Sequence, residues 1–199
     1  MLNRLCLVGL FVLFGSAAQA AEEADHAIHE ELRAVLRQIE SAVNTGEFDK
    51  MLPVLSEKIR GTPVNQEFLS SRAEVSAYFK KWFGTGGYLK KLEMQLTPDA
   101  LTELSDDKSW GIVYGKGVEK YVLADGRPYE LHTRWTATMV KEGDGRWRVR
   151  GIHVGTDFLD NPILAEAERA LGFGVAGGLA GGVILGLLTG WLVFRKKKA

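Results

Sequence analysis

Hydrophobic residues recur along this chain at two different spacings. Between residues 26 and 44 they stand three and four positions apart, which is typical of an amphipathic helix with one buried face. The positions are Ile28, Leu32, Val35, Leu36, Ile39 and Val43. From residue 90 the spacing becomes two, which is typical of strands that are buried on one face. The pattern therefore predicts helices first and a sheet afterwards.

Two short elements are expected after the first helix. Gly46 ends that helix, and residues 47–56 have the pattern of a second, short helix in which Pro53 marks a kink or an end. Residues 58–68 alternate only weakly and contain a glycine and a proline, so they are expected to form a short edge strand or a loop.

A third helix is predicted between Ser71 and Gly84. Ser71 has the side chain of an N-cap, and Glu74 three residues later completes a capping box. Gly84 ends the helix. Its expected apolar face consists of Val75, Tyr78, Phe79, Trp82 and Phe83.

The second half of the chain predicts four or five antiparallel strands. Residues 92–96 alternate, 101–104 resume the alternation after a turn, and three longer runs cover residues 110–123, 129–139 and 147–154. Asp125-Gly126 and Asp144-Gly145 join the longer runs as hairpin turns. We expect Trp110, Tyr114 and Trp135 on apolar strand faces, and no acidic residue on those faces. Helices followed by strands predict an α+β fold, with the helices packed on one side of a curved antiparallel sheet.

An uncharged stretch near the C-terminus predicts a transmembrane helix. Residues 171–194 contain no charged residue and no proline. A helix of this length reaches ~36 Å and can cross a ~30 Å hydrocarbon core. The basic residues within 195–199 predict a cytoplasmic tail, so the preceding chain is expected on the other side of the membrane. Residues 165–170 are expected to form a juxtamembrane helix that joins the span directly.

The N-terminus has the pattern of a secretory signal peptide. Arg4 precedes an apolar run too short to span a membrane, and Ala18-Gln19-Ala20 forms a cleavage site of small residues. The alternative is an anchor that is not cleaved. We therefore divide the chain into a signal peptide (1–20), an exported domain (21–164), a juxtamembrane helix (165–170), a transmembrane helix (171–194) and a basic tail (195–199).

Charge and cysteine content exclude several classes of function. Five of the 25 basic residues lie in the signal peptide and the tail, whereas all 25 acidic residues lie in the exported part. An acidic exported part argues against nucleic acid as a partner. The only cysteine, Cys6, lies in the signal peptide, so the processed chain is expected to have no disulfide and no thiolate site. His26 and His29 have metal-ligand spacing without a third ligand, so we predict no metal site.

The C-terminal part of the exported domain resembles the nuclear transport factor 2-like, or SnoaL-like, superfamily. Residues 135–164 (WTATMVKEGDGRWRVRGIHVGTDFLDNPIL) show a strand, a DG turn, a Trp-containing strand that ends near a histidine, and a short tail. The resemblance extends over about residues 27–164. It implies a cone-shaped (cystatin-like) fold of three helices on a curved sheet. The family includes isomerases, cyclases, dehydratases and non-catalytic binding modules. Gly155 stands where the family usually has Ser or Thr.

The resemblance also implies a conical apolar pocket with a few polar side chains. The expected lining residues are Tyr78, Trp82, Trp110, Tyr114, Trp135, Trp147 and His153; the alternative is that these aromatic residues only fill the core. For an enzyme, His153 as base and Tyr114 as hydrogen-bond donor are the expected catalytic pair. The first expectation is a domain that binds a small apolar ligand or a partner protein, without a cofactor. The alternative is a SnoaL-like isomerase, cyclase or dehydratase.

Glycines in the predicted span suggest that two copies associate. Gly174, Gly178, Gly182, Gly186 and Gly190 recur at every fourth position, so they share one side of the helix. Small residues let two helix backbones approach closely in lipid, which predicts a homodimer. The alternative is that glycine is simply frequent in membrane spans.

The compartment has two possible assignments. Because the chain has no Asn-x-Ser/Thr site and its expected mature form no cysteine, we predict a bacterial inner membrane with a periplasmic domain. Two lysines, third and fourth from the C-terminus, also match an endoplasmic-reticulum retrieval signal, which is the alternative.

Overall fold

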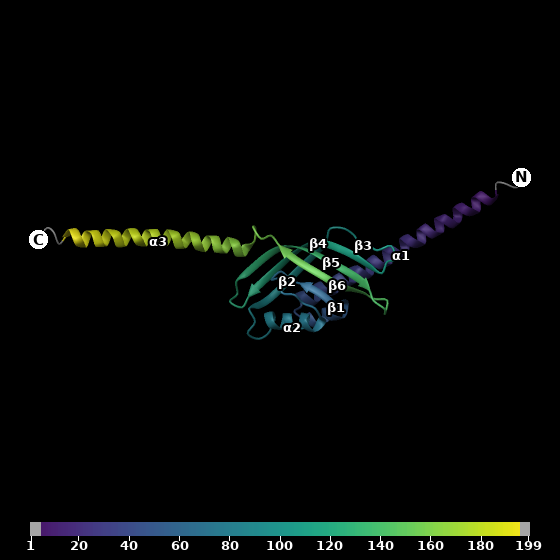
Figure 1. Ribbon diagram of the computed structural model, residues 1–199, viewed down its shortest axis with the longest axis horizontal. Helices are drawn as coiled ribbons and strands as arrows, with labels where there is room; N and C mark the ends of the chain where they lie inside the picture. Colours follow the sequence, from purple (N-terminus) through teal and green to yellow (C-terminus); the bar gives the residue numbers. More distant parts are fainter. Residues whose placement is uncertain (1–4, 196–199) are drawn as a thin grey trace. The chain divides into compact units, whose positions relative to one another are not determined.

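The computed structural model describes residues 5–195, which form two compact units, one before and one after the boundary between residues 156 and 157. Figure 1 shows the chain coloured by sequence. Arg4 and residues 196–199 of the predicted basic tail lie outside the described residues. Each unit is described by itself.

The first unit begins with a long helix. α1 (Leu5–Asn44) starts well before the predicted helix and ends where the sequence predicts. Gly46 follows with a φ of 72°, a left-handed conformation that glycine adopts without strain. A short 3-10 helix, η1 (Phe48–Val54), follows and contains Pro53. Cleavage after Ala20 remains a prediction.

The predicted capping of the third helix is confirmed. α2 (Arg72–Phe83) has Ser71 as its N-cap, and the Ser71 Oγ accepts a hydrogen bond of 3.2 Å from the backbone N–H of Glu74. The Glu74 carboxylate reaches back to the backbone N–H of Ser70 at 2.6 Å, one residue before the cap. Two N–H groups at the start of the helix are thereby satisfied.

Six strands form one mixed sheet. They are β1 (Leu55–Thr62), β2 (Leu89–Pro98), β3 (Glu103–Leu104), β4 (Trp110–Leu123), β5 (Pro128–Lys141) and β6 (Trp147–Thr156). The order is β1-β6-β5-β4-β2, and β3 pairs with β4. All pairs are antiparallel except β1 with β6, which is parallel. The expectation of an entirely antiparallel sheet is wrong at this edge, because β1 comes from the helical half of the chain.

The register of the β4–β5 hairpin decides which residues of β4 face inward. The backbone N–H of Leu123 donates to the carbonyl of Arg127 at 2.9 Å, so three residues form the loop, and the last of them, Gly126, has a φ of 90°. Trp135 is therefore paired with Gly115, and odd-numbered residues of both strands share the inner face. The predicted inner face of β4, which contained Trp110 and Tyr114, is its outer face.

A β-bulge changes the facing of β6. Trp147 and Val149 are both buried. Between Val149 and Gly151 the pairing with β5 shifts by one residue. An extra residue reverses the alternation of a strand. Beyond the bulge, Ile152 packs against the core and His153 is exposed.

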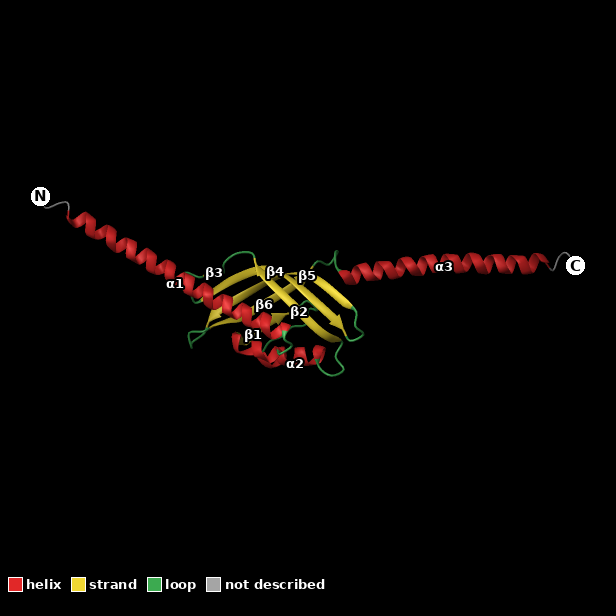
Figure 2. Ribbon diagram, turned by 180° about the vertical axis from the view of Figure 1, so that it is seen from behind, coloured by secondary structure: helices red, strands yellow, loops and turns green. Residues whose placement is uncertain are grey.

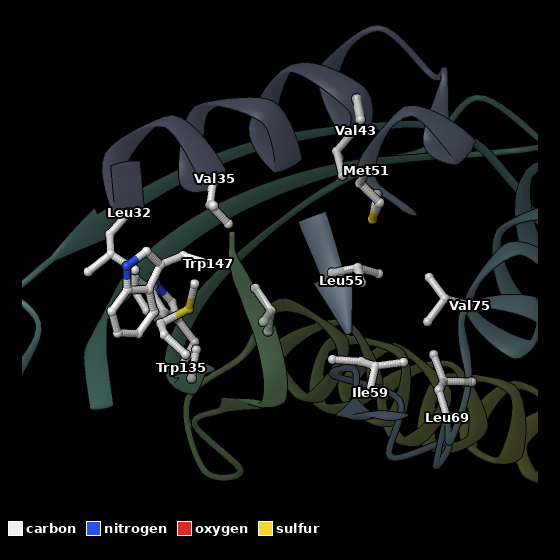
Figure 3. Packing of buried hydrophobic residues seen from close by; sticks show 14 of the residues in the cluster. Leu32, Val35, Val43, Met51, Leu55, Ile59, Leu69, Val75, Trp135 and Trp147 are labelled. Atoms are coloured by element: carbon white, nitrogen blue, oxygen red, sulfur yellow. The ribbon is translucent and has the colours of Figure 1, made fainter. Parts of the chain in front are cut away.

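Helices α1 and α2 lie against the sheet (Figure 2), and the buried core residues come from these helices and from the strands that they cover. Leu32 and Val35 of α1 face Trp135 and Trp147 of the sheet (Figure 3). The apolar face predicted for the first helix is confirmed by the burial of Leu32, Val35 and Val43.

The described part of the second unit, residues 157–195, contains one helix, α3 (Pro162–Arg195). Among the described residues, Pro162–Leu192 is the one segment that is long and apolar enough to cross a membrane. Helix α3 as a whole begins three residues before the predicted juxtamembrane helix and contains the predicted span, residues 171–194, without interruption.

Candidate functional site

The first unit contains a cavity of about 150 Å³ between the sheet, α1 and α2. Aliphatic and aromatic carbon atoms form nearly all of its wall. Val43, Met51, Leu55, Ile59, Leu69 and Val75 point toward it from several elements (Figure 3). A cavity of this kind holds a ligand about as large as benzene.

One carboxyl group stands in this apolar wall. Glu119 lies on the inner face of β4, and only 5% of its surface is exposed. The hydroxyl of Tyr121 donates a hydrogen bond to Glu119 Oε2, and the hydroxyl of Thr133 donates one to Oε1 at 3.2 Å. Tyr121 and Tyr78 also line the cavity. These four residues are called the Glu119 cluster below.

Burial dominates the electrostatics of the Glu119 cluster. It raises the pKa of the Glu119 carboxyl, although the hydrogen bonds from Tyr121 and Thr133 act in the opposite direction. Burial also raises the pKa of Tyr121, and the neighbouring Glu119 charge adds to this effect. For Tyr78 burial is again the main cause of a raised pKa, followed by the charges of Glu67 and Glu119. Both phenols therefore stay protonated and can donate hydrogen bonds.

The Glu119 cluster can exchange a hydrogen bond or a proton with a bound molecule. A carboxylate has about four acceptor positions, and two are used by Tyr121 and Thr133. Among the described residues that line the cavity, none is basic. No group of three His, Cys, Asp or Glu residues in the described part of the chain is arranged to hold a metal ion.

Glycines of β4 make the space that the site needs. A Cβ atom on Gly117 would lie 2.6 Å from Thr133 Oγ1, and one on Gly115 would lie 2.7 Å from the Trp135 ring. A side chain at position 117 would push Thr133 away from Glu119. A side chain at position 115 would push the Trp135 ring away from β4. The absence of side chains there is therefore part of the architecture of the site.

A second cavity of about 120 Å³ adjoins the first. Five residues line both cavities: Ile39, Leu96, Trp135, Val149 and Ile152. The second cavity continues under α1, where His29 and Arg33 lie at its wall, and along β5, where Ala137 and Met139 do.

The predicted pocket residues separate into three groups. Tyr78 lines the first cavity, and Trp135 lines both. Trp147 is buried in the core without lining either cavity. Trp82 is half-buried on α2 and donates from Nε1 to the Glu67 carboxylate at 2.9 Å, outside the cavities.

Trp110, Tyr114 and His153 lie on the outer face of the sheet. Trp110 and Tyr114 are 46% and 37% exposed, and His153 is exposed as well. Tyr114 and His153 are both paired with Thr136 of the intervening strand, so their backbones are about 9.5 Å apart. The hydroxyl of Tyr114 donates to Glu103 at 3.1 Å. The structure therefore does not bring Tyr114 and His153 together, and neither residue lines the first or the second cavity.

Sequence reasoning missed Glu119 and Tyr121. The inner face of β4 contains Gly111, Gly115 and Gly117, so it has a weak hydrophobic pattern, whereas the outer face contains Trp110 and Tyr114. The three glycines all fall on odd-numbered positions, the face that also contains Glu119 and Tyr121. This shared spacing was the feature of the sequence that could have indicated a crowded inner face. The expectation that no acidic residue lies on an inner strand face is wrong, since Glu119 does.

Comparisons with known proteins identify the fold. A scan with family models found no match, and a search of curated proteins found no significant match. Among solved structures, a hexachlorocyclohexane dehydrochlorinase (LinA) type 2 is similar with a TM-score of 0.61 and 9% identity, over 68% of this chain and 90% of that one.

Two further solved structures are similar in fold to this chain. An uncharacterised protein with a cystatin-like fold from Caulobacter vibrioides has a TM-score of 0.54 and 19% identity, over 71% of this chain and 96% of that one. ActVI-ORFA from Streptomyces coelicolor has a TM-score of 0.53 and 14% identity, over 65% and 98% of the two chains. The predicted resemblance is confirmed at the level of the fold: the first unit has the cystatin-like fold of the nuclear transport factor 2-like, or SnoaL-like, proteins.

Proposed function

We propose that this chain is a membrane-anchored, exported domain that binds a small, mostly apolar ligand in the cavity beside Glu119. The observation that carries the proposal is a single buried carboxyl group in an otherwise apolar cavity. An apolar cavity with a few convergent polar groups is the common form of a small-molecule site. A carboxyl that is buried without a basic partner costs stability, which favours a functional reason for its presence.

The anchoring part of the proposal comes from the sequence of α3. The uncharged stretch 171–194, followed by basic residues, is expected to cross a bacterial inner membrane with the domain on the periplasmic side. The five glycines at every fourth position support a homodimer through this helix. Binding of a partner protein instead of a small molecule is an alternative for the same domain.

A second candidate function is acid–base catalysis by Glu119. A carboxylate with a raised pKa can take a proton from an activated C–H group. The electron pair then moves to a neighbouring carbonyl oxygen or expels a leaving group, and Tyr78, which lines the same cavity, is the proposed hydrogen-bond donor to the developing charge. The raised pKa of Glu119 favours this candidate, and so does the fold shared with a dehydrochlorinase. Glu119 and Tyr78 replace His153 and Tyr114 in these roles.

The test is native mass spectrometry of the full chain, held in amphipol and purified without added ligand. We expect a bound small molecule and the mass of a dimer. Val75→Phe, which fills the cavity, should abolish the bound mass, whereas Ala77→Phe at an exposed position of the same helix should retain it.

The same sample distinguishes the two candidates. A bound molecule that stays unchanged on incubation supports a binding protein. Conversion in the native chain but not in Glu119→Gln supports the enzyme. Absence of any bound molecule, or equal occupancy in Val75→Phe, would contradict both.

A further inference from the structure

The two cavities follow one another along β5. Thr133, Trp135, Ala137 and Met139 are successive inward-facing residues of this strand, and all four are buried. Thr133 donates to Glu119 of the first cavity, whereas Ala137 and Met139 line the second. From Thr133 to Met139 the strand extends about 20 Å. The cavities therefore form a row along the sheet and not two unrelated holes.

Trp135 stands at the boundary between them. It lines both cavities and is 4% exposed. Its indole Nε1 donates to the backbone carbonyl of Lys116 at 3.1 Å, which fixes the ring against β4. The indole thus forms part of the wall of both cavities. Ile39 and Leu96 also line both cavities.

Charge determines which end of a ligand each cavity accepts. The described residues that line the first cavity include no basic group, so an anionic head group beside Glu119 would have no cation to balance it. The second cavity has His29 and Arg33 at its wall under α1, and the Arg33 guanidinium is paired with Glu30. A neutral polar group at Glu119 and an apolar tail in the second cavity satisfy both surroundings.

We propose that the two cavities bind one elongated, uncharged amphiphile of about ten carbon atoms, such as a linear aliphatic alcohol, with its hydroxyl on Glu119 and its tail past Trp135. The first cavity, of about 150 Å³, holds about six carbon atoms, and the second, of about 120 Å³, holds about five. A chain of about ten carbons together with its hydroxyl oxygen therefore fills both. This inference rests on the proposed binding function and adds the class and the length of the ligand.

The experiment is calorimetric titration of the full chain in amphipol with 1-alkanols of four to fourteen carbons. We expect affinity to rise about fourfold per methylene up to about ten carbons and then to level off. Ala137→Leu, which fills only the second cavity, should bind 1-hexanol normally but bind 1-decanol at least about tenfold more weakly. Thr136→Leu on the outer face of the same strand is the matched control.

Three further variants test the second cavity, the polar group and the specificity of binding. Val113→Leu fills the second cavity from β4 and serves if Ala137→Leu does not fold, as judged by circular dichroism. Glu119→Leu should weaken 1-decanol binding about tenfold. Val75→Phe should remove binding at every chain length, which separates binding in the cavity from partition around α3.

The outcomes separate this inference from the proposed function. If the affinity of the native chain stops rising at 1-hexanol, the proposal of an elongated ligand is wrong, whereas the proposed binding site still stands. Tighter binding of decanoate than of 1-decanol at pH 7 would overturn the neutral head group. Failure of every alkanol to bind, together with no bound mass in the purified chain, would contradict the proposed function itself.

Discussion

At the scale of single residues, Glu119 is the most informative position. It is nearly fully buried, and its hydrogen bonds come from neutral hydroxyl groups and not from a cation. Since its pKa is raised, the folded protein holds the proton of Glu119 more tightly than the unfolded chain does. Ionisation of Glu119 therefore favours unfolding, which is the reverse of a carboxylate in a salt bridge such as Asp144 with Arg148.

This difference predicts how Glu119→Gln depends on pH. Below the unfolded-state pKa of about 4.3 both forms of the protein carry a neutral side chain, so the variant has little effect. As the pH rises from there through the raised folded-state pKa, the native protein loses stability that the variant keeps. We expect the variant's advantage in the free energy of unfolding to grow across this window, measured by urea titration at several pH values.

A constant difference between Glu119→Gln and the native protein from pH 4 to pH 8 would contradict this expectation. Comparing Glu119→Gln with the native protein at each pH removes the contribution of the other carboxylates, including Asp99, whose pKa is lowered by hydrogen bonding to Arg134.

At the scale of elements, β4 and its glycines determine the shape of the site. Glu119 and Tyr121 can face the cavity because β4 places odd-numbered residues inward. Gly115 and Gly117 on the same face leave room for Trp135 and Thr133 from the neighbouring strand. Strand β4 thus supplies the polar groups of the site, and its two glycines leave room for the side chains of the neighbouring β5.

Gly117→Ala tests this arrangement. The new methyl group would lie 2.6 Å from Thr133 Oγ1, so Thr133 must move and its hydrogen bond to Glu119 is lost. We expect the free energy of unfolding to fall by about 1–3 kcal/mol. Gly151→Ala in β6 is the control, because its nearest neighbours would be 3.8 Å away and the change should stay within about 0.5 kcal/mol. Urea unfolding followed by tryptophan fluorescence measures both, and equal effects would argue against the close contact.

At the scale of the whole molecule, the chain consists of two units of different chemistry. The first has a hydrophobic core beneath α1 and α2, whereas the apolar stretch of α3 that could cross a membrane is not buried. An apolar helix with no protein cover is stable in lipid and not in water.

Cell fractionation tests the proposed anchoring. The full chain should sediment with membranes and resist extraction by alkaline carbonate, because α3 would be held by the hydrophobic effect and not by charge. A chain truncated after Asn161 should be released into the soluble fraction. Recovery of the full chain in the soluble fraction at high speed would contradict the membrane assignment.

The sequence by itself determined the order and the approximate bounds of the elements. Local spacing and local side-chain chemistry are enough to predict the helix over residues 26–44, the cap at Ser71, the strands from residue 90 and the apolar α3. The resemblance to SnoaL-like proteins then gave the fold correctly. These features are predictable because neighbours in sequence decide them.

Only the tertiary structure decided which strand faces line the cavity. A three-residue loop at Gly126 places Glu119 inward and Tyr114 outward, and a bulge in β6 turns His153 to the surface. One residue more or fewer in a loop or a strand exchanges the two faces of all that follows, while the alternation in the sequence looks the same. The candidate site was therefore hidden by the register between strands, which depends on pairing across the sheet.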